Sequence, residues 1–373
     1  MRVLHVVASA RRRGAEVFAS DLISALGSDG VDHRVAVLHG DGGPAVRFGV
    51  PTAMVAGDGA LLPGLRVAPA AVRGLTKLAR SWRPDVVQAH GGEALKHLVL
   101  GGMHRRIPVV LRSLGAAPPW IQHGPRRAAH GFLMRQSARV VVVAEALRPE
   151  MVRTFGLSDD RVVTIPNAVD RRRLRSNRDP QETRSAFGVP PTHRVLLSLG
   201  ALTWEKDPLA AVEVSARLAD RGLPVTHLMA GDGPMRADVE RAIGRRGLQS
   251  RLQVLGTRDD VPDLLSAADV VLFASRSDGM EGMPAALIEA GMMARPVVAY
   301  SVAGVSEVVA HGETGLLAPS GNLDALIERA ILLLEDDRMR REMGSAAERR
   351  CATRFDIGPV SRRYLSLYQS LAR

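Results

Sequence analysis

Short runs of apolar residues, rich in valine, alternate along the chain with longer amphipathic stretches. Continuous apolar runs are typical of strands buried on both faces of a parallel sheet, and the amphipathic stretches are typical of the helices that cover it. The predicted strands are 3–8, 34–38, 52–55, 85–89, 109–111, 139–143 and 162–165 in the first half, and 195–199, 226–230, 252–254, 270–274, 296–300 and 315–318 in the second. This rhythm predicts two doubly wound, Rossmann-like α/β domains in tandem.

The boundary between these domains is predicted in a polar, proline-punctuated stretch. Arginines and aspartates dominate residues 170–180, and two prolines follow at 190–191. Such a segment is too polar to bury and marks a connection. We therefore predict an N-terminal domain over 1–170, a C-terminal domain over 171–355, and a terminal helix over 356–373 that packs back on the first domain. The predicted apolar face of that helix consists of Val360, Tyr364, Leu367, Tyr368 and Leu371.

Composition narrows the class of protein. The 373 residues are 46% hydrophobic and 24% charged, as in ordinary globular domains, and only 3% are aromatic, which argues against stacking on single-stranded nucleic acid. The single Cys351 excludes an internal disulfide and any multi-cysteine metal site. Charged residues interrupt every apolar run before it reaches the length of a membrane span. We expect a cytoplasmic protein, either soluble or peripheral at the inner face of the membrane.

The net charge of +11 is unevenly distributed. Residues 1–170 carry 22 Lys and Arg against 13 Asp and Glu, whereas residues 171–373 carry 28 against 26. Three interpretations stay open for the basic half: a solvated arginine-rich face, attraction to an anionic acceptor or membrane, and nucleic acid, which the aromatic content disfavours. The basic residues concerned include Arg105, Arg106, Arg126, Arg127 and Arg135.

Ligands of open α/β sheets bind at the carboxyl ends of the strands. Gly14 follows the first predicted strand and opens a helix, where it allows backbone amides to approach an anion, although a plain tight turn has the same pattern. Gly200 follows the strand at 195–199, and Lys206 stands just before a helix that begins near Pro208. Because lysines are rare here, Lys206 is a candidate point charge for phosphate.

The densest group of candidate residues follows the strand at 270–274. Pro284 is expected in the first turn of a helix whose free amides can bind an anion, with Glu281 just before it. Glu289 lies further along the same helix among alanine, leucine and isoleucine, where a buried carboxylate needs partners such as sugar hydroxyls. Glycine turns at Gly231 and Gly304 follow two other strands of the same sheet edge.

In these motifs the sequence resembles the family 4 retaining glycosyltransferases, which have the GT-B fold of two Rossmann-like domains facing a cleft. The resemblance rests on the segment EGMPAALIEAGMMARPVV from Glu281, GDGP from Gly231, IPNAVD from Ile165 and GETGLL from Gly312. It implies transfer of a sugar from a nucleotide-sugar donor held mainly by the second domain. It also implies same-face attack assisted by the leaving phosphate, without a covalent nucleophile or a metal.

The resemblance implies a role for each matching residue. Glu289 hydrogen-bonds the nucleotide ribose, and Lys206 contacts the diphosphate. Glu281 and the following amides hold the donor sugar, and Gly14 lets the loop of the first domain close on the diphosphate and acceptor. The implied donor-binding set is completed by Gly200, Gly231, Arg276, Gly282, Met283 and Pro284.

Three departures from the family pattern affect this interpretation. Ala201 stands where an arginine is usual, so that Arg276 is the candidate replacement. Arg13 precedes Gly14 where a second glycine is usual, and Leu114 stands where many members have histidine. His90, at the end of a predicted strand, is then the candidate for an acceptor-side catalytic role, the alternative being a structural histidine in a loop. A nucleotide-sugar epimerase on the same fold and a non-catalytic nucleotide- or glycan-binding subunit remain alternatives, and the donor base and acceptor are open.

Overall fold

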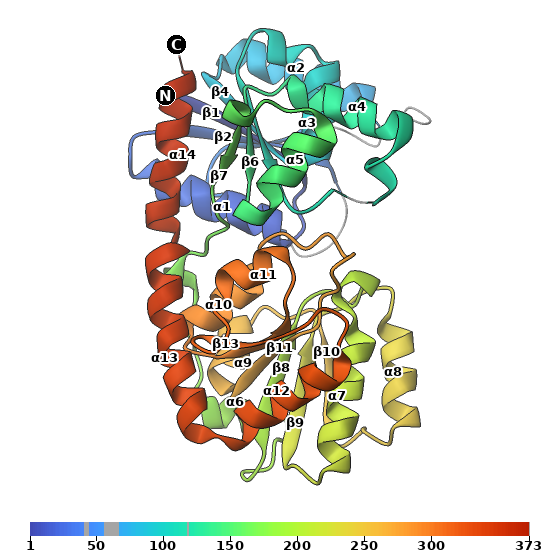
Figure 1. The fold of residues 1–373 in the computed structure, drawn as a ribbon. Helices are drawn as coiled ribbons and strands as arrows, with labels where there is room; N and C mark the ends of the chain where they lie inside the picture. The colour runs from blue at the N-terminus through green and yellow to red at the C-terminus, as the bar shows by residue number, and fades with distance from the viewer. Residues whose placement is uncertain (41–44, 56–66, 118, 373) are drawn as a thin grey trace. The chain divides into compact units, whose positions relative to one another are not determined.

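The computed structural model describes residues 1–40, 45–55, 67–117 and 119–372. The chain forms two compact units: unit 1 contains Met1–Val169 and Ile357–Arg373, and unit 2 contains Asp170–Asp356 (Figure 1). Each unit is a parallel sheet with helices connecting its strands, so the predicted fold class of two doubly wound α/β domains is confirmed.

The sheet of unit 1 has the order β3-β2-β1-β4-β5-β6-β7, and all its strands are parallel. The direction of winding reverses between β1 and β4. The strands are β1 (Arg2–Ser9), β2 (Asp32–His39), β3 (Thr52–Met54), β4 (Val86–His90), β5 (Val109–Ser113), β6 (Arg139–Val142) and β7 (Val162–Thr164). The helices are α1 (Gly14–Gly27), α2 (Pro69–Trp82), α3 (Gly92–Leu100), α4 (Gly124–Arg135), α5 (Arg148–Phe155) and α14 (Ile357–Leu371).

The sheet of unit 2 has the order β10-β9-β8-β11-β12-β13 and is also parallel. Its winding reverses between β8 and β11. The strands are β8 (Arg194–Leu199), β9 (Val225–Ala230), β10 (Leu252–Gly256), β11 (Val270–Phe273), β12 (Val297–Tyr300) and β13 (Gly315–Ala318). The helices are α6 (Pro180–Ala186), α7 (Pro208–Asp220), α8 (Arg236–Arg245), α9 (Val261–Ala267), α10 (Ala285–Met292), α11 (Ala303–Val308), α12 (Leu323–Glu335) and α13 (Asp337–Arg354).

Every strand predicted from the apolar runs is present, and each end lies within two residues of the prediction. The agreement has a simple cause. A strand covered by helices on both faces needs an unbroken apolar run, and the polar residues that end the run also begin the loop.

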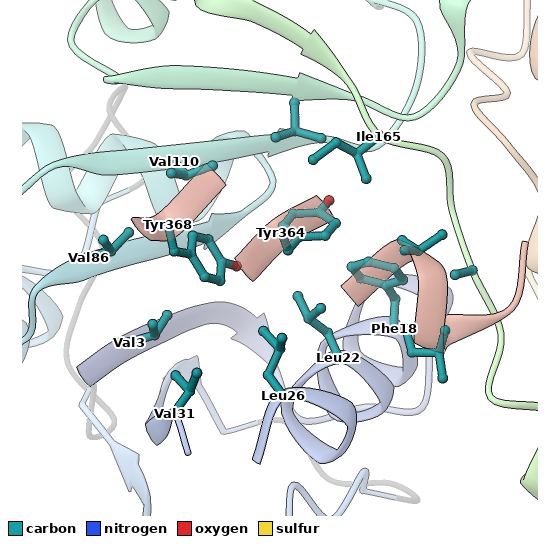
Figure 2. Close-up of a cluster of buried hydrophobic side chains, with 14 residues drawn as sticks. Val3, Phe18, Leu22, Leu26, Val31, Val86, Val110, Ile165, Tyr364 and Tyr368 are labelled. Atoms are coloured by element: carbon teal, nitrogen blue, oxygen red, sulfur yellow. The ribbon is translucent and has the colours of Figure 1, made fainter. Parts of the chain in front are cut away.

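The terminal helix α14 belongs to the core of unit 1. Val360, Tyr364 and Tyr368 are buried against Phe18 and Leu22 of α1 and against the strands, with Leu367 and Leu371 partly buried at the margin. Figure 2 shows both tyrosine rings between the α1 side chains and Val86 and Val110 of the sheet. The Tyr368 hydroxyl donates a hydrogen bond to Gln88 Oε1 (2.9 Å). Thus the chain returns to unit 1 after completing unit 2.

Within the described ranges, no helix is both long and apolar enough to cross a membrane. The arginines considered for an anionic surface are all exposed: Arg105 and Arg106 lie at the 3-10 turn Met103–Arg105 that follows α3, and the other three lie on α4. Arg135 differs from the others because its guanidinium donates to the carbonyl of Phe155 (2.7 Å).

Candidate functional site

The candidate residues of unit 2 gather where the winding of its sheet reverses. The loops that follow β8 and β11 leave the carboxyl ends of adjacent strands and contact each other. The Arg276 amide donates to the carbonyl of Glu205 (2.9 Å), and Gly279 packs so closely on Glu205 that a Cβ there would lie 2.9 Å from the Glu205 Cβ. This is the position at which open α/β sheets bind their ligands.

Lys206 and Glu281 meet across these two loops. The Lys206 ammonium forms a salt bridge with Glu281 Oε2, to which the Ser275 hydroxyl also donates (3.0 Å). The ammonium lies 4.7 Å from the centre of the Phe273 ring. The Lys206 side chain is 28% exposed and that of Glu281 14%, so both groups border solvent while their stems are packed. The structure therefore brings together the residues predicted to bind the diphosphate and the donor sugar.

Glu289 lies on α10 and is paired with an arginine that the sequence did not single out. Arg173, in a 3-10 turn at Arg171–Arg173 near the start of unit 2, donates to Glu289 Oε1 (2.7 Å). This bond supplies the partner that a largely buried carboxylate requires. The sequence could not single out Arg173, because it lies within a run of three arginines whose charge is the same.

The candidate glycines differ in what their backbone requires. Gly231 has φ +153°, and a Cβ there would lie 1.7 Å from the carbonyl oxygen of Gly200. Gly231 is therefore needed for contact between two loops. A Cβ at Gly304 would lie 1.5 Å from the carbonyl oxygen of Gly282, so α11 fixes the loop after β11 in the same way. At Gly14, in unit 1, the backbone conformation is ordinary and an added Cβ would meet nothing within 4 Å.

The remaining donor-side candidates are placed as follows. Gly282, Met283 and Pro284 are buried, and Pro284 is the N-cap of α10 in an extended conformation, so its expected place in the first helical turn was wrong by one residue. Arg276 pairs with the Asp278 carboxylate (2.9 and 3.2 Å) and lies 3.9 Å from Asp207. Its charge is engaged within its own loop, whereas Ala201 is exposed.

A small pocket of about 30 Å³ lies beneath Lys206, between the carboxyl ends of β8 and β11. Its lining includes Gly200, Ala201 and Ser275. In the part of the chain that the structure describes, His, Cys, Asp and Glu side chains form no group of three or more that could hold a metal ion.

His90 is the last residue of β4 in unit 1 and is 4% exposed, so it lies in a strand and not in a loop. Its burial fits the structural alternative as well as the catalytic one. Its Nε2 lies 3.1 Å from Nδ1 of His5. Burial, and to a smaller extent the nearby Arg112 guanidinium, lowers the pKa of His90 to about 3. Leu114, by contrast, is 43% exposed.

Comparison with known protein families gives a match for each of the two units. The family described as Glycosyltransferase Family 4 matches residues 12–173, and the family described as Glycosyl transferases group 1 matches residues 179–350. The chain is a GT-B glycosyltransferase. The resemblance noted in the sequence is thereby confirmed, and the enzyme transfers a sugar.

Individual relatives support this assignment over nearly the whole enzyme. A 2-deoxystreptamine glucosyltransferase from Streptomyces kanamyceticus is 28% identical over 340 residues, covering 84% of this chain and 87% of the relative. A 2-deoxystreptamine N-acetyl-D-glucosaminyltransferase from Streptomyces fradiae is 27% identical and covers 94% of this chain and 89% of the relative. The crystal structure of HepE from Anabaena with UDP and glucose has a TM-score of 0.85 at 22% identity, covering 99% of this chain and all of that one, and shares the fold.

Proposed function

We propose that this glycosyltransferase moves a hexose-type sugar from a UDP- or GDP-sugar to a hydroxyl acceptor, with retention of configuration. The observation that carries the proposal is the meeting of Lys206 and Glu281 at the reversal point of the unit 2 sheet, with Glu289 on α10, the helix that follows the Glu281 loop. Nucleotide ligands bind at this position in doubly wound folds. The UDP bound in the HepE structure supports a uridine donor as the first to test.

In this proposal the diphosphate is the leaving group, and catalysis consists of stabilising its growing negative charge. The bond between the sugar C1 and the phosphate oxygen breaks, the acceptor oxygen bonds C1 on the same face, and the acceptor proton passes to the phosphate. Lys206 and the free amides at the N-terminus of α10 supply positive charge without a metal ion. We therefore expect activity to persist in EDTA and the product to keep the donor's anomeric configuration by NMR.

Glu289 is proposed to bind the ribose. Oε1 accepts from Arg173, which leaves Oε2 to accept from a ribose hydroxyl. A hydrogen bond to a charged group contributes about 1.5–3 kcal/mol, so Glu289→Ala should weaken UDP binding about 10- to 100-fold in a calorimetric titration. Glu328→Ala, on the exposed side of α12, is the matched control and should leave the affinity unchanged. Equal affinities of the wild type and E289A would refute the assignment.

The acceptor side is proposed in unit 1, with His90 as the catalytic candidate and Gly14 as the anion-binding candidate at the start of α1. Relatives named for 2-deoxystreptamine favour a glycosylated small metabolite over a polysaccharide or glycolipid. The exposed arginines of unit 1 are proposed to attract an anionic acceptor or the membrane that carries it.

One incubation separates this proposal from its alternatives. With UDP- and GDP-sugars, slow release of free nucleotide that accelerates with acceptor supports a transferase. A changed sugar nucleotide formed without acceptor indicates an epimerase, and binding without turnover over a panel of acceptors indicates a non-catalytic subunit.

A further inference from the structure

Three buried histidines form a line across the sheet of unit 1. His33 lies near the start of β2, His5 in the middle of β1, and His90 at the carboxyl end of β4. Their exposed fractions are 3%, 0% and 4%. In the strand register His5 is opposite Val35 and Gln88, so each neighbouring histidine is offset by two residues and points to the same face. The line therefore runs diagonally to the sheet edge where ligands bind.

Each histidine is bonded to the next. His5 Nε2 lies 3.0 Å from His33 Nδ1, and His5 Nδ1 lies 3.1 Å from His90 Nε2. A neutral imidazole has one donor and one acceptor nitrogen. His5 must then donate through one nitrogen and accept through the other, so all bonds of the chain point in one direction. The direction decides whether His90 Nδ1 carries a proton or a lone pair.

The three imidazoles are neutral in the folded protein. Burial lowers the pKa of His33 to about 4 and that of His90 to about 3, and it holds the pKa of His5 well below its ordinary value. Charge therefore does not choose the direction from within the chain, and the groups at its two ends must do so.

The charge beside the His90 end selects the direction. His33 Nε2 and His90 Nδ1 are buried without a hydrogen-bond partner among the residues that the structure describes. Arg112 lies directly opposite His90 in the strand register, on the same face of the sheet, and its guanidinium lowers the pKa of His90. Asp32 is exposed and precedes His33 in β2, so its side chain points to the other face. A nearby cation favours a lone pair over an N–H on the free ring nitrogen. Arg112 therefore selects the direction in which His90 Nδ1 is bare and Nε2 carries the proton on all three rings.

We propose that His5 and His33 are positioning residues that hold His90 as the neutral Nε2–H tautomer, and that its bare, buried Nδ1 is the acceptor for an O–H group that enters at the carboxyl edge of the sheet. This inference rests on the proposed acceptor-side role of His90. It adds the chemistry of the interaction: a neutral acceptor atom selects a hydroxyl, or a water bound to one, and disfavours an anionic group.

The tautomers are measured directly by long-range 1H–15N correlation NMR of the full-length enzyme labelled in its histidines. There are 11 histidines, and His90→Asn assigns the signal of interest. We expect His90 Nδ1 to resonate as an unprotonated nitrogen and Nε2 as a protonated one at pH 7. A protonated His90 Nδ1, whether from the other tautomer or from an imidazolium, overturns the proposal without any further variant.

Variants of His33 test its action at a distance. His33→Leu removes the nitrogen that accepts a hydrogen bond from His5 Nε2–H, so both tautomers of His90 should be populated. His33→Asn places an amide oxygen near the position of His33 Nδ1 and should restore the Nε2–H tautomer of His90. His227→Asn, in unit 2, is the control. The acceptor kcat/KM should fall about tenfold or more in H33L and recover in H33N, with UDP affinity unchanged, since partners that orient a functional imidazole have effects of this scale. An unchanged His90 tautomer in H33L overturns the inference.

Failure of the inference is distinguishable from failure of the proposed function. If the NMR result fails while His90→Ala still lowers acceptor kcat/KM, the histidine chain is refuted and the role of His90 stands. If the tautomers are as expected and H90A keeps full activity, the catalytic role of His90 is refuted.

Discussion

His227 provides a test of how acid destabilises unit 2. The residue lies on β9, is 1% exposed, and sits between the hydroxyls of Ser198 (2.9 Å from Nε2) and Ser215 (2.6 Å from Nδ1). Burial lowers the pKa of His227 to about 3. In the unfolded chain the ordinary pKa of about 6.5 applies, so between these values the unfolded state binds a proton that the folded state does not. Stability is complete above about pH 6.5 and falls as the pH drops.

The size of this effect follows from the two pKa values. Each pH unit below the unfolded pKa removes about 1.4 kcal/mol, so the step from pH 7 to pH 5 should lower the free energy of unfolding by about 2 kcal/mol through His227 alone. His227→Gln keeps hydrogen-bonding groups but does not titrate. Whatever the stability of H227Q at pH 7, the free energy of unfolding of the wild type minus that of H227Q should therefore be about 2 kcal/mol lower at pH 5 than at pH 7.

Urea unfolding measures this difference. Trp204 is one of three tryptophans and lies in unit 2, so replacing Trp82 and Trp120 by Phe makes fluorescence report on that unit. Between pH 8 and pH 9 the difference should stay constant, because neither state takes up a proton at His227 there. A difference that is also constant between pH 7 and pH 5 would refute a neutral, buried His227.

Three further outcomes are expected. Arg173→Met should weaken UDP binding in the wild type but not in an E289A background, because Arg173 acts through Glu289; additive effects in calorimetry would contradict this. Gly231→Ala should lower both Tm and UDP affinity, since its Cβ would lie 1.7 Å from a carbonyl oxygen, whereas Gly244→Ala on α8 should raise stability by about 0.5–1 kcal/mol. Burial raises the pKa of Cys351 to about 12, so DTNB at pH 8 should label it only after urea unfolding; rapid labelling of the native enzyme would show that the thiol is accessible.

The sequence predicted the fold well because its signal is local. Every buried strand of a doubly wound sheet must be a short apolar run, and every crossover must be amphipathic, so strand positions follow from residues close together in the chain. The same logic located the loops that carry the candidate residues: Lys206 and Glu281 each follow a predicted strand. It also placed α14 as an amphipathic helix, since Val360, Tyr364 and Tyr368 recur at helical spacing.

Pairings between distant segments were beyond local reasoning. In the sequence, His5 is simply a polar residue within an apolar strand. Only the strand order β2-β1-β4 places its ring between those of His33 and His90. Likewise, the arginines at 171–173 are equivalent in sequence until the fold directs Arg173 to Glu289, 116 residues away.

The sequence alone determined the fold class, the strands and the edge of the sheet at which we propose the donor site. The tertiary structure decided which side chains pair with one another there: Lys206 with Glu281 and Glu289 with Arg173. It also showed that position 231 must be glycine because its backbone packs against the carbonyl oxygen of Gly200. The reason is physical. Apolar periodicity records burial residue by residue, whereas a hydrogen bond or salt bridge depends on the positions of two segments that only the assembled sheet brings within 3 Å.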